Sequence, residues 1–167
     1  MSEFTPAPDD AQNGAAAPPP LLINHQYVKD LSFEVPGAPE IFSTLRAAPQ
    51  VQINLDVQAR RLAEGQEVFE VTLAVRAEAS DTSTGTARVV FIAELSYGGI
   101  FTLTGIPAES VEPVLLVECP RLLFPFARNI IADVTREGGF PPVLLQPIDF
   151  VSLWQSRRGV SSAVGHA

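Results

Sequence analysis

The stretch "ARVVFIAELSYGGIFTLTGI", residues 87–106, decides the fold because it is long, apolar and interrupted by two adjacent glycines. Its first half alternates with period two, which predicts a β-strand. The residues expected to face the core are Val89, Phe91, Ala93 and Leu95. The opposite face, with Val90, Ile92 and Glu94, is more apolar than a solvated face needs to be, which favours contact with a partner.

The glycines of this stretch need a structural reason. Glycine weakens the interior of a strand, and usually marks a bulge, a bend or a close approach of another backbone. We predict a bend or bulge at Gly98-Gly99, after which the strand resumes as "IFTLTGI".

Three further stretches alternate with period two, at residues 25–35, 51–59 and 69–79. Short turn-rich links at 60–67 and 80–85 join the later strands as a meander. Alternation of this kind is typical of an antiparallel sheet with one packed and one wetted face. In the first stretch, it places Tyr27, Leu31 and Phe33 on one face and Val28, Asp30, Ser32 and Glu34 on the other.

The period changes to helical spacing after Gly105. Residues 107–139 begin with proline and acidic residues, end in Gly138-Gly139, and contain internal prolines that interrupt the helix. A short helix follows with Asp149 as its N-cap, and residues 39–49 accommodate one helical turn. The predicted fold is α+β: a four-stranded antiparallel sheet with a long interrupted helix and a short C-terminal helix on one face.

The ends of the chain differ in composition from its middle. Residues 1–20 are rich in alanine, proline and aspartate and predict a disordered leader, residues 21–158 form one domain, and residues 159–167 a flexible tail. The net charge of −8 disfavours nucleic acid and anionic membranes as partners. No apolar run approaches the ~20 residues of a membrane span, and no signal pattern opens the chain, so a cytoplasmic location is expected.

Residue patterns that carry chemistry are scarce. His25 and His166 lack metal-ligand spacing, no glycine-rich phosphate loop occurs, and Cys119 fits a buried structural thiol better than a nucleophile. The strand carboxylates, Glu70 and Glu94 among them, fall on wetted positions, where solvation is far commoner than acid–base catalysis. We expect no enzyme activity, no metal and no cofactor.

Apolar residues are abundant in the loops of the second half, as in "LLFPF" and "FPPVLLQP". For any single residue, sealing the core is the more probable role. Together they exceed what one small core needs, and exposed apolar stretches with an acidic rim are typical of oligomerisation or of apolar partners.

Three blocks of the sequence, in order, closely resemble the SecB family of bacterial protein-export chaperones. They are "YVKDLSFEVPGAPEIF" (27–42), "YGGIFTLTGI" (97–106) and "CPRLLFPFARNIIADVTREGGFPPVLLQPIDFVSLW" (119–154). The resemblance implies a cytosolic homotetramer, built as a dimer of dimers, without nucleotide or metal. It also implies binding of unfolded precursor proteins and their delivery to the translocase motor SecA.

The resemblance further implies two sets of site residues. The residues expected to dock SecA are Asp30, Glu34, Ile92 and Glu94. The residues expected to line the client groove are Ile41, Phe42, Leu45, Phe124, Phe140, Leu144 and Phe150.

Three functions remain open at this point. The leading one is an ATP-independent chaperone that keeps precursors competent for translocation. The others are a carrier of a small apolar ligand, and a chaperone of the same fold serving a toxin–antitoxin system. A deep closed pocket favours the carrier, whereas a long open groove favours a chaperone.

Overall fold

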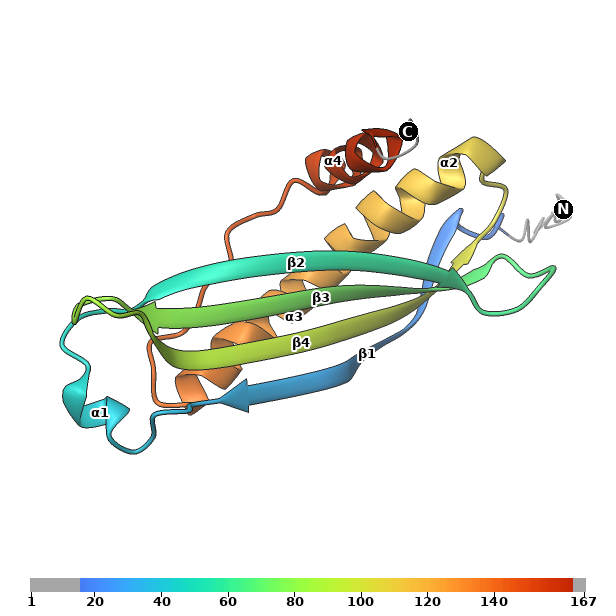
Figure 1. The fold of residues 1–167 in the computed structure, drawn as a ribbon. Coiled ribbons are helices and arrows are strands. Elements are labelled where there is room, and N and C mark those ends of the chain that lie inside the picture. The colour runs from blue at the N-terminus through green and yellow to red at the C-terminus, as the bar shows by residue number, and fades with distance from the viewer. Residues whose placement is uncertain (1–15, 164–167) are drawn as a thin grey trace, which may run out of the picture.

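The computed structural model describes residues 16–163, with side chains through Gly159, and shows an α+β fold as predicted. The elements are β1 (Leu21–Glu34), α1 (Ile41–Thr44), β2 (Gln50–Arg61), β3 (Val68–Asp81), β4 (Arg88–Leu103), α2 (Ala108–Pro113), the π-helical turn η1 (Val114–Glu118), α3 (Cys119–Glu137) and α4 (Phe150–Ala163). The strands form one antiparallel sheet in the order β1-β4-β3-β2. Figure 1 shows the helices on one face of this sheet, and residues 1–15 of the predicted leader and 164–167 of the predicted tail lie outside the described part.

The core lies between the sheet and the long helix. On β3 and β4 the odd-numbered residues face the helix, as their alternation predicts, and Leu73 and Phe101 are fully buried. From α3, Leu123 and Ile131 pack against them with no exposed surface. The helix crosses the sheet diagonally (Figure 1), so the far end of β2 is left uncovered and Val51 is 39% exposed.

The predicted interruption of the long helix is a wider turn and not a break. The π-helical turn η1 follows directly on Pro113, and α3 then continues through Pro125 to Glu137. Proline removes one backbone donor and crowds the preceding turn, and π-helical turns inside α-helices accommodate such disturbances. The helix ends at Gly138, as expected.

Gly98 and Gly99 are explained by close approach on both faces of the sheet. The register between β3 and β4 continues through both glycines without a shift, so the predicted bulge is absent there. A Cβ atom on Gly98 would lie 2.8 Å from the Tyr27 ring, and one on Gly99 would lie 2.6 Å from Phe101 and 2.9 Å from Leu123. The glycines therefore let a tyrosine pack on one face while the helix packs on the other.

The bulges lie elsewhere and overturn the predicted orientations of the residues beside them in β1 and β4. In β1 the register shifts between Val28 and Asp30, so Tyr27 pairs with Gly98 and lies on the same face as Asp30. Our predictions that Tyr27 shares a face with Leu31, and Val28 with Asp30, were therefore wrong, because one extra residue reverses the alternation. A second shift in β4 turns Val90 inward, where it is fully buried instead of facing outward.

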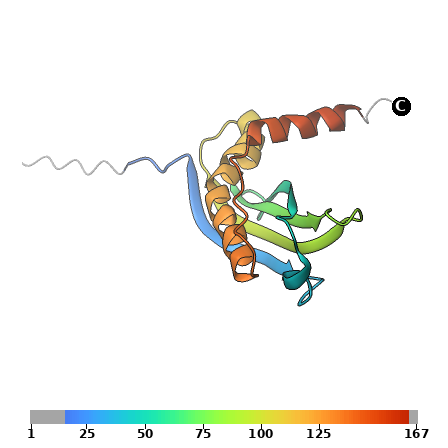
Figure 2. The same cartoon turned by 90° about the vertical axis from the view of Figure 1, so that its left-hand side faces the viewer.

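The C-terminal helix is fixed at its start and along one side. The Asp149 carboxylate accepts a hydrogen bond from the Ser152 backbone N–H at 3.0 Å, which confirms the predicted N-cap. Arg157 donates to the Val57 carbonyl at 2.9 Å and pairs with Asp56, so α4 covers part of the β2 edge. Figure 2 shows α4 extending away from the helical layer, and it continues to Ala163, past the predicted start of the tail at 159.

Candidate functional site

The residues predicted for SecA docking lie together on the outer face of the sheet, away from the long helix. Strands β1 and β4 are neighbours, and Glu34 lies directly opposite Ile92. Asp30 is paired with Ser96 and lies diagonal to Glu94. Asp30 and Glu34 are exposed, whereas Ile92 and Glu94 are half-buried. The arrangement is a negative patch around one apolar side chain.

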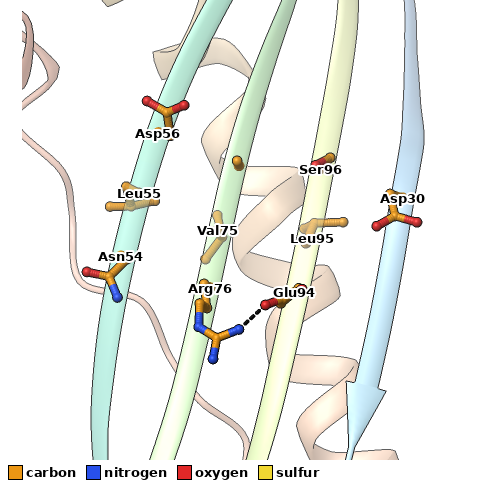
Figure 3. A pocket seen from close by; sticks show the side chains of 10 residues that line it. Asp30, Asn54, Leu55, Asp56, Val75, Arg76, Glu94, Leu95 and Ser96 are labelled. Carbon is orange, nitrogen blue, oxygen red and sulfur yellow. Dashed lines mark hydrogen bonds and ion pairs between the residues drawn. The ribbon is translucent and has the colours of Figure 1, made fainter.

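The middle of this face is hollowed. A depression of about 250 Å³ is lined from all four strands, with Asp30 and Asp56 on opposite rims and Ala74 and Ser96 among the smallest lining residues. Figure 3 shows Asp30 and Asp56 on the two edge strands and the Arg76 guanidinium reaching across to Glu94. The sequence predicted the carboxylates of this surface but not the arginine between them.

A buried polar cluster lies farther along the outer face. Glu70 is 4% exposed, and its carboxylate accepts hydrogen bonds from the Tyr27 hydroxyl, from Lys29 Nζ at 3.0 Å and from Arg60 Nε at 2.5 Å. The hydrogen bond from Tyr27 and the two cations lower the pKa of Glu70 from 4.5 to about 2, against the effect of burial. Burial and the neighbouring carboxylate raise the pKa of Tyr27 to about 12. Glu70 was predicted to be a solvated surface residue, and that was wrong.

The predicted client-groove residues separate into two groups. One group surrounds α1 and the loop after α3, where the Phe140 ring lies 4.9 Å from Phe91 and 5.3 Å from Phe42, centroid to centroid. Ile41 is 1% exposed and Phe140 7%, so both pack inside this small cluster. Phe42 and Leu144, by contrast, are 54% and 55% exposed.

A cavity of about 290 Å³ adjoins this aromatic cluster. Its walls are apolar and come from three segments: Pro49 and Val51 at the start of β2, Phe91 of β4, and the Phe140–Leu144 loop. The uncovered end of β2 thus forms one side of an apolar groove. The exposure of Val51 results from the diagonal path of the helix, which leaves this end of β2 uncovered.

The second group, Phe124 and Phe150, belongs to the main core. Their rings meet edge to face at 6.1 Å, and Phe150 is 1% exposed. They join α3 to the start of α4 and lie outside the residues that line the apolar groove. The family resemblance implied a place in the groove for both, and core and groove aromatics cannot be told apart in a linear sequence.

The single cysteine lies in the hydrophobic core, as the sequence predicted. Cys119 is fully buried, and burial together with Glu118 raises its pKa to about 12, as fits a structural thiol. Residues 16–163 contain no group of three or more His, Cys, Asp or Glu side chains placed to hold a metal ion. None of the helices in this part of the chain has the length and apolar character needed to cross a membrane.

Comparison with known proteins identifies the family. A family model described as "Preprotein translocase subunit SecB" matches residues 14–160. The chain belongs to the SecB family. The protein-export protein SecB of Granulibacter bethesdensis is 67% identical over 160 residues, covering 95% of this chain and 94% of its own length. That of Gluconacetobacter diazotrophicus is 58% identical over an alignment that covers 100% of both chains.

A solved structure agrees on the fold. A SecB-like chaperone of Mycobacterium tuberculosis, in complex with an antitoxin peptide, superposes with a TM-score of 0.62 at 14% identity, covering 77% of this chain and 91% of that one. At this identity the likeness shows the fold alone. The SecB relatives named above confirm the export-chaperone prediction at the family level, and neither the apolar-ligand carrier nor the toxin–antitoxin chaperone is favoured.

Proposed function

We propose that this protein is an ATP-independent cytoplasmic chaperone that holds unfolded precursor proteins and delivers them to the SecA motor. One observation supports this most strongly: the acidic patch and the apolar groove lie on opposite faces of the same sheet. A client in the groove therefore leaves the acidic patch free. The same chain can hold a precursor and contact the motor at once.

The client surface is the apolar groove at the α1 end of the sheet. Leu144 and Val51 expose apolar area in the cavity wall, Phe42 stacks on Phe140 beside it, and Leu45 packs against the adjoining aromatic cluster. Burying apolar side chains of a client here lowers the concentration of aggregation-prone free chain without any nucleotide. Phe140 and Ile41 support the groove from below, because both are buried in the chain itself.

The motor surface is the acidic patch of Asp30, Glu34, Ile92 and Glu94. Carboxylates on a chain of net charge −8 steer a basic partner, and a half-buried isoleucine between them supplies apolar contact. Charge of this kind chiefly determines the association rate and its dependence on salt.

Assembly into a homotetramer, as a dimer of dimers, fits the apolar area left on the outside of the helix and on β1. Phe126 of α3 is 47% exposed and Leu122 40%, while Val28 on the β1 edge is 48% exposed. Light scattering is expected to give about four times the chain mass of 17.9 kDa. A monomer at micromolar concentration contradicts the tetramer.

The experiment that tests the function measures two affinities on the same variants. Asp30→Lys/Glu94→Lys is expected to weaken binding of purified SecA strongly, most at low salt, and to leave binding of a urea-denatured precursor unchanged. Leu144→Asp is expected to do the reverse. Joint loss of both affinities in either variant, or wild-type protein that binds neither partner without ATP, contradicts the proposal.

A further inference from the structure

We infer that Arg76 competes from within the chain for the docking carboxylate of Glu94 and thereby lowers the affinity for a basic partner surface. This rests on the proposed function, since it concerns the same acidic patch. Arg76 itself belongs to β3 and was not among the predicted site residues.

Arg76 lies between two carboxylates on the outer face. One terminal nitrogen pairs with Glu94 of β4, and the other donates to Glu78 of its own strand at 2.7 Å. The register explains the contact, because Arg76 and Glu94 are directly opposite each other in the β3–β4 ladder. Cross-strand pairs at this spacing interact directly. Figure 3 shows the arginine lying at the margin of the depression.

The other two carboxylates of the acidic patch, those of Asp30 and Glu34, differ from Glu94 in having no partner in the described part of the chain. Within the described part of the chain, the side chains of Asp30 and Glu34 make no hydrogen bond or ion pair, and both are exposed. The patch therefore contains two carboxylates ready for a partner and one that already pairs with an arginine of the same chain. A lysine or arginine of the partner reaches Glu94 only by displacing the Arg76 guanidinium or by sharing the carboxylate with it.

How strongly Arg76 competes depends on how exposed the Arg76–Glu94 ion pair is to solvent. The Arg76 side chain is 39% exposed and that of Glu94 46%, so the pair is a surface ion pair of modest strength. Removing the arginine charge is expected to tighten binding of purified SecA about two- to fivefold at low salt. The gain should shrink as ionic strength rises, because exposed charges are screened.

Arg76→Gln tests this directly, and Arg121→Gln is its matched control. Arg121 forms an exposed ion pair with Glu118 on the helical layer, so its loss changes the net charge equally but lies away from the acidic patch. SecA affinity is expected to rise about two- to fivefold in Arg76→Gln, and Arg121→Gln, which reports the general effect of losing one positive charge, is expected to give a clearly smaller gain. In a Glu94→Gln background, the additional effect of Arg76→Gln should disappear.

The outcomes separate this inference from the proposed function. Wild-type protein that fails to bind SecA overturns the proposed function. Wild-type binding with equal gains in the two arginine variants shows a general charge effect and overturns the competition. Weaker binding by Arg76→Gln shows that the arginine positions Glu94 for the partner, which also overturns it. A gain that persists in the Glu94→Gln background excludes Glu94 as the group for which Arg76 competes.

Discussion

The two faces of the sheet bury side chains to a similar depth. The buried side chains contact apolar rings on one face and hydrogen-bonding or charged groups on the other. On the helix side, Phe140 is 7% exposed and contacts other aromatic rings. On the outer side, Glu70 is 4% exposed and is surrounded by a hydroxyl and two cations. Burial alone therefore does not identify the core of this molecule. The helix side depends on apolar packing, and the outer side on a satisfied polar cluster beside an open acidic patch.

The largest expected effect is on the helix side. Phe140→Asp places a carboxylate among the aromatic rings of Phe33, Phe42 and Phe91. We expect the free energy of unfolding to fall by about 3–5 kcal/mol, through lost packing and an uncompensated buried charge. Urea unfolding followed by tryptophan fluorescence or circular dichroism measures the change.

Leu144→Asp is the control for that variant, because Leu144 is 55% exposed in the same loop. Its free energy of unfolding should change by no more than about 0.5 kcal/mol, while client affinity falls. Equal destabilisation by the two substitutions would mean that Leu144 also packs in the core, and that the apolar groove is closed in solution.

The next largest effect concerns the polar cluster. Glu70→Gln removes the negative charge that pairs with Lys29 and Arg60. We expect the free energy of unfolding to fall by about 1–3 kcal/mol at neutral pH. The pKa of Glu70 is lowered from 4.5 to about 2 in the folded protein, so the unfolded chain takes up its proton first as the pH falls. Its contribution to stability is therefore complete above pH 4.5 and is lost as the pH falls toward about 2.

Urea unfolding at several acidic pH values tests whether this contribution to stability is lost as the pH falls. Wild type should lose stability more steeply than Glu70→Gln between those two pKa values. Glu67→Gln is the matched control, since Glu67 makes an exposed ion pair with Arg61 close by in sequence. Parallel acid profiles for wild type and Glu70→Gln would show that Glu70 does not make these contacts in solution.

Much of the helix side could be predicted from the sequence because alternation reports burial wherever the register is regular. It succeeded along β3 and β4 and failed at Tyr27 and Val90, where an extra residue in the strand reverses the faces. Nothing in a single sequence distinguishes a bulge from an ordinary residue at such positions. The close contacts that explain Gly98-Gly99 were likewise out of reach, because Tyr27 and Leu123 come from distant parts of the chain.

The outer side was harder to predict, for an electrostatic reason. Polar residues on an outward strand face look solvated, and only their convergence in space shows otherwise. Glu70 is separated from Tyr27 by 43 positions and from Lys29 by 41, and Arg76 lies 18 positions before Glu94. Opposite charges directly across a strand pair are predictable once the register is known. The register of β3 against β4 depends on the loop and the Val90 bulge between them.

The smallest expected effect compares two carboxylates of the acidic patch. Asp30→Lys alters an exposed side chain that has no ion pair in the described part of the chain. Its free energy of unfolding should therefore change by less than about 0.5 kcal/mol. Glu94→Lys removes the ion pair with Arg76 and places a second cation beside that arginine. We therefore expect the free energy of unfolding to fall by about 0.5–1 kcal/mol. Urea unfolding of both variants at low and high salt measures the difference. Salt should narrow it, because screening weakens both the lost attraction and the new repulsion. Equal stability of the two variants at low salt would mean that Arg76 does not hold Glu94 in solution, and that all three docking carboxylates are equally available to a partner.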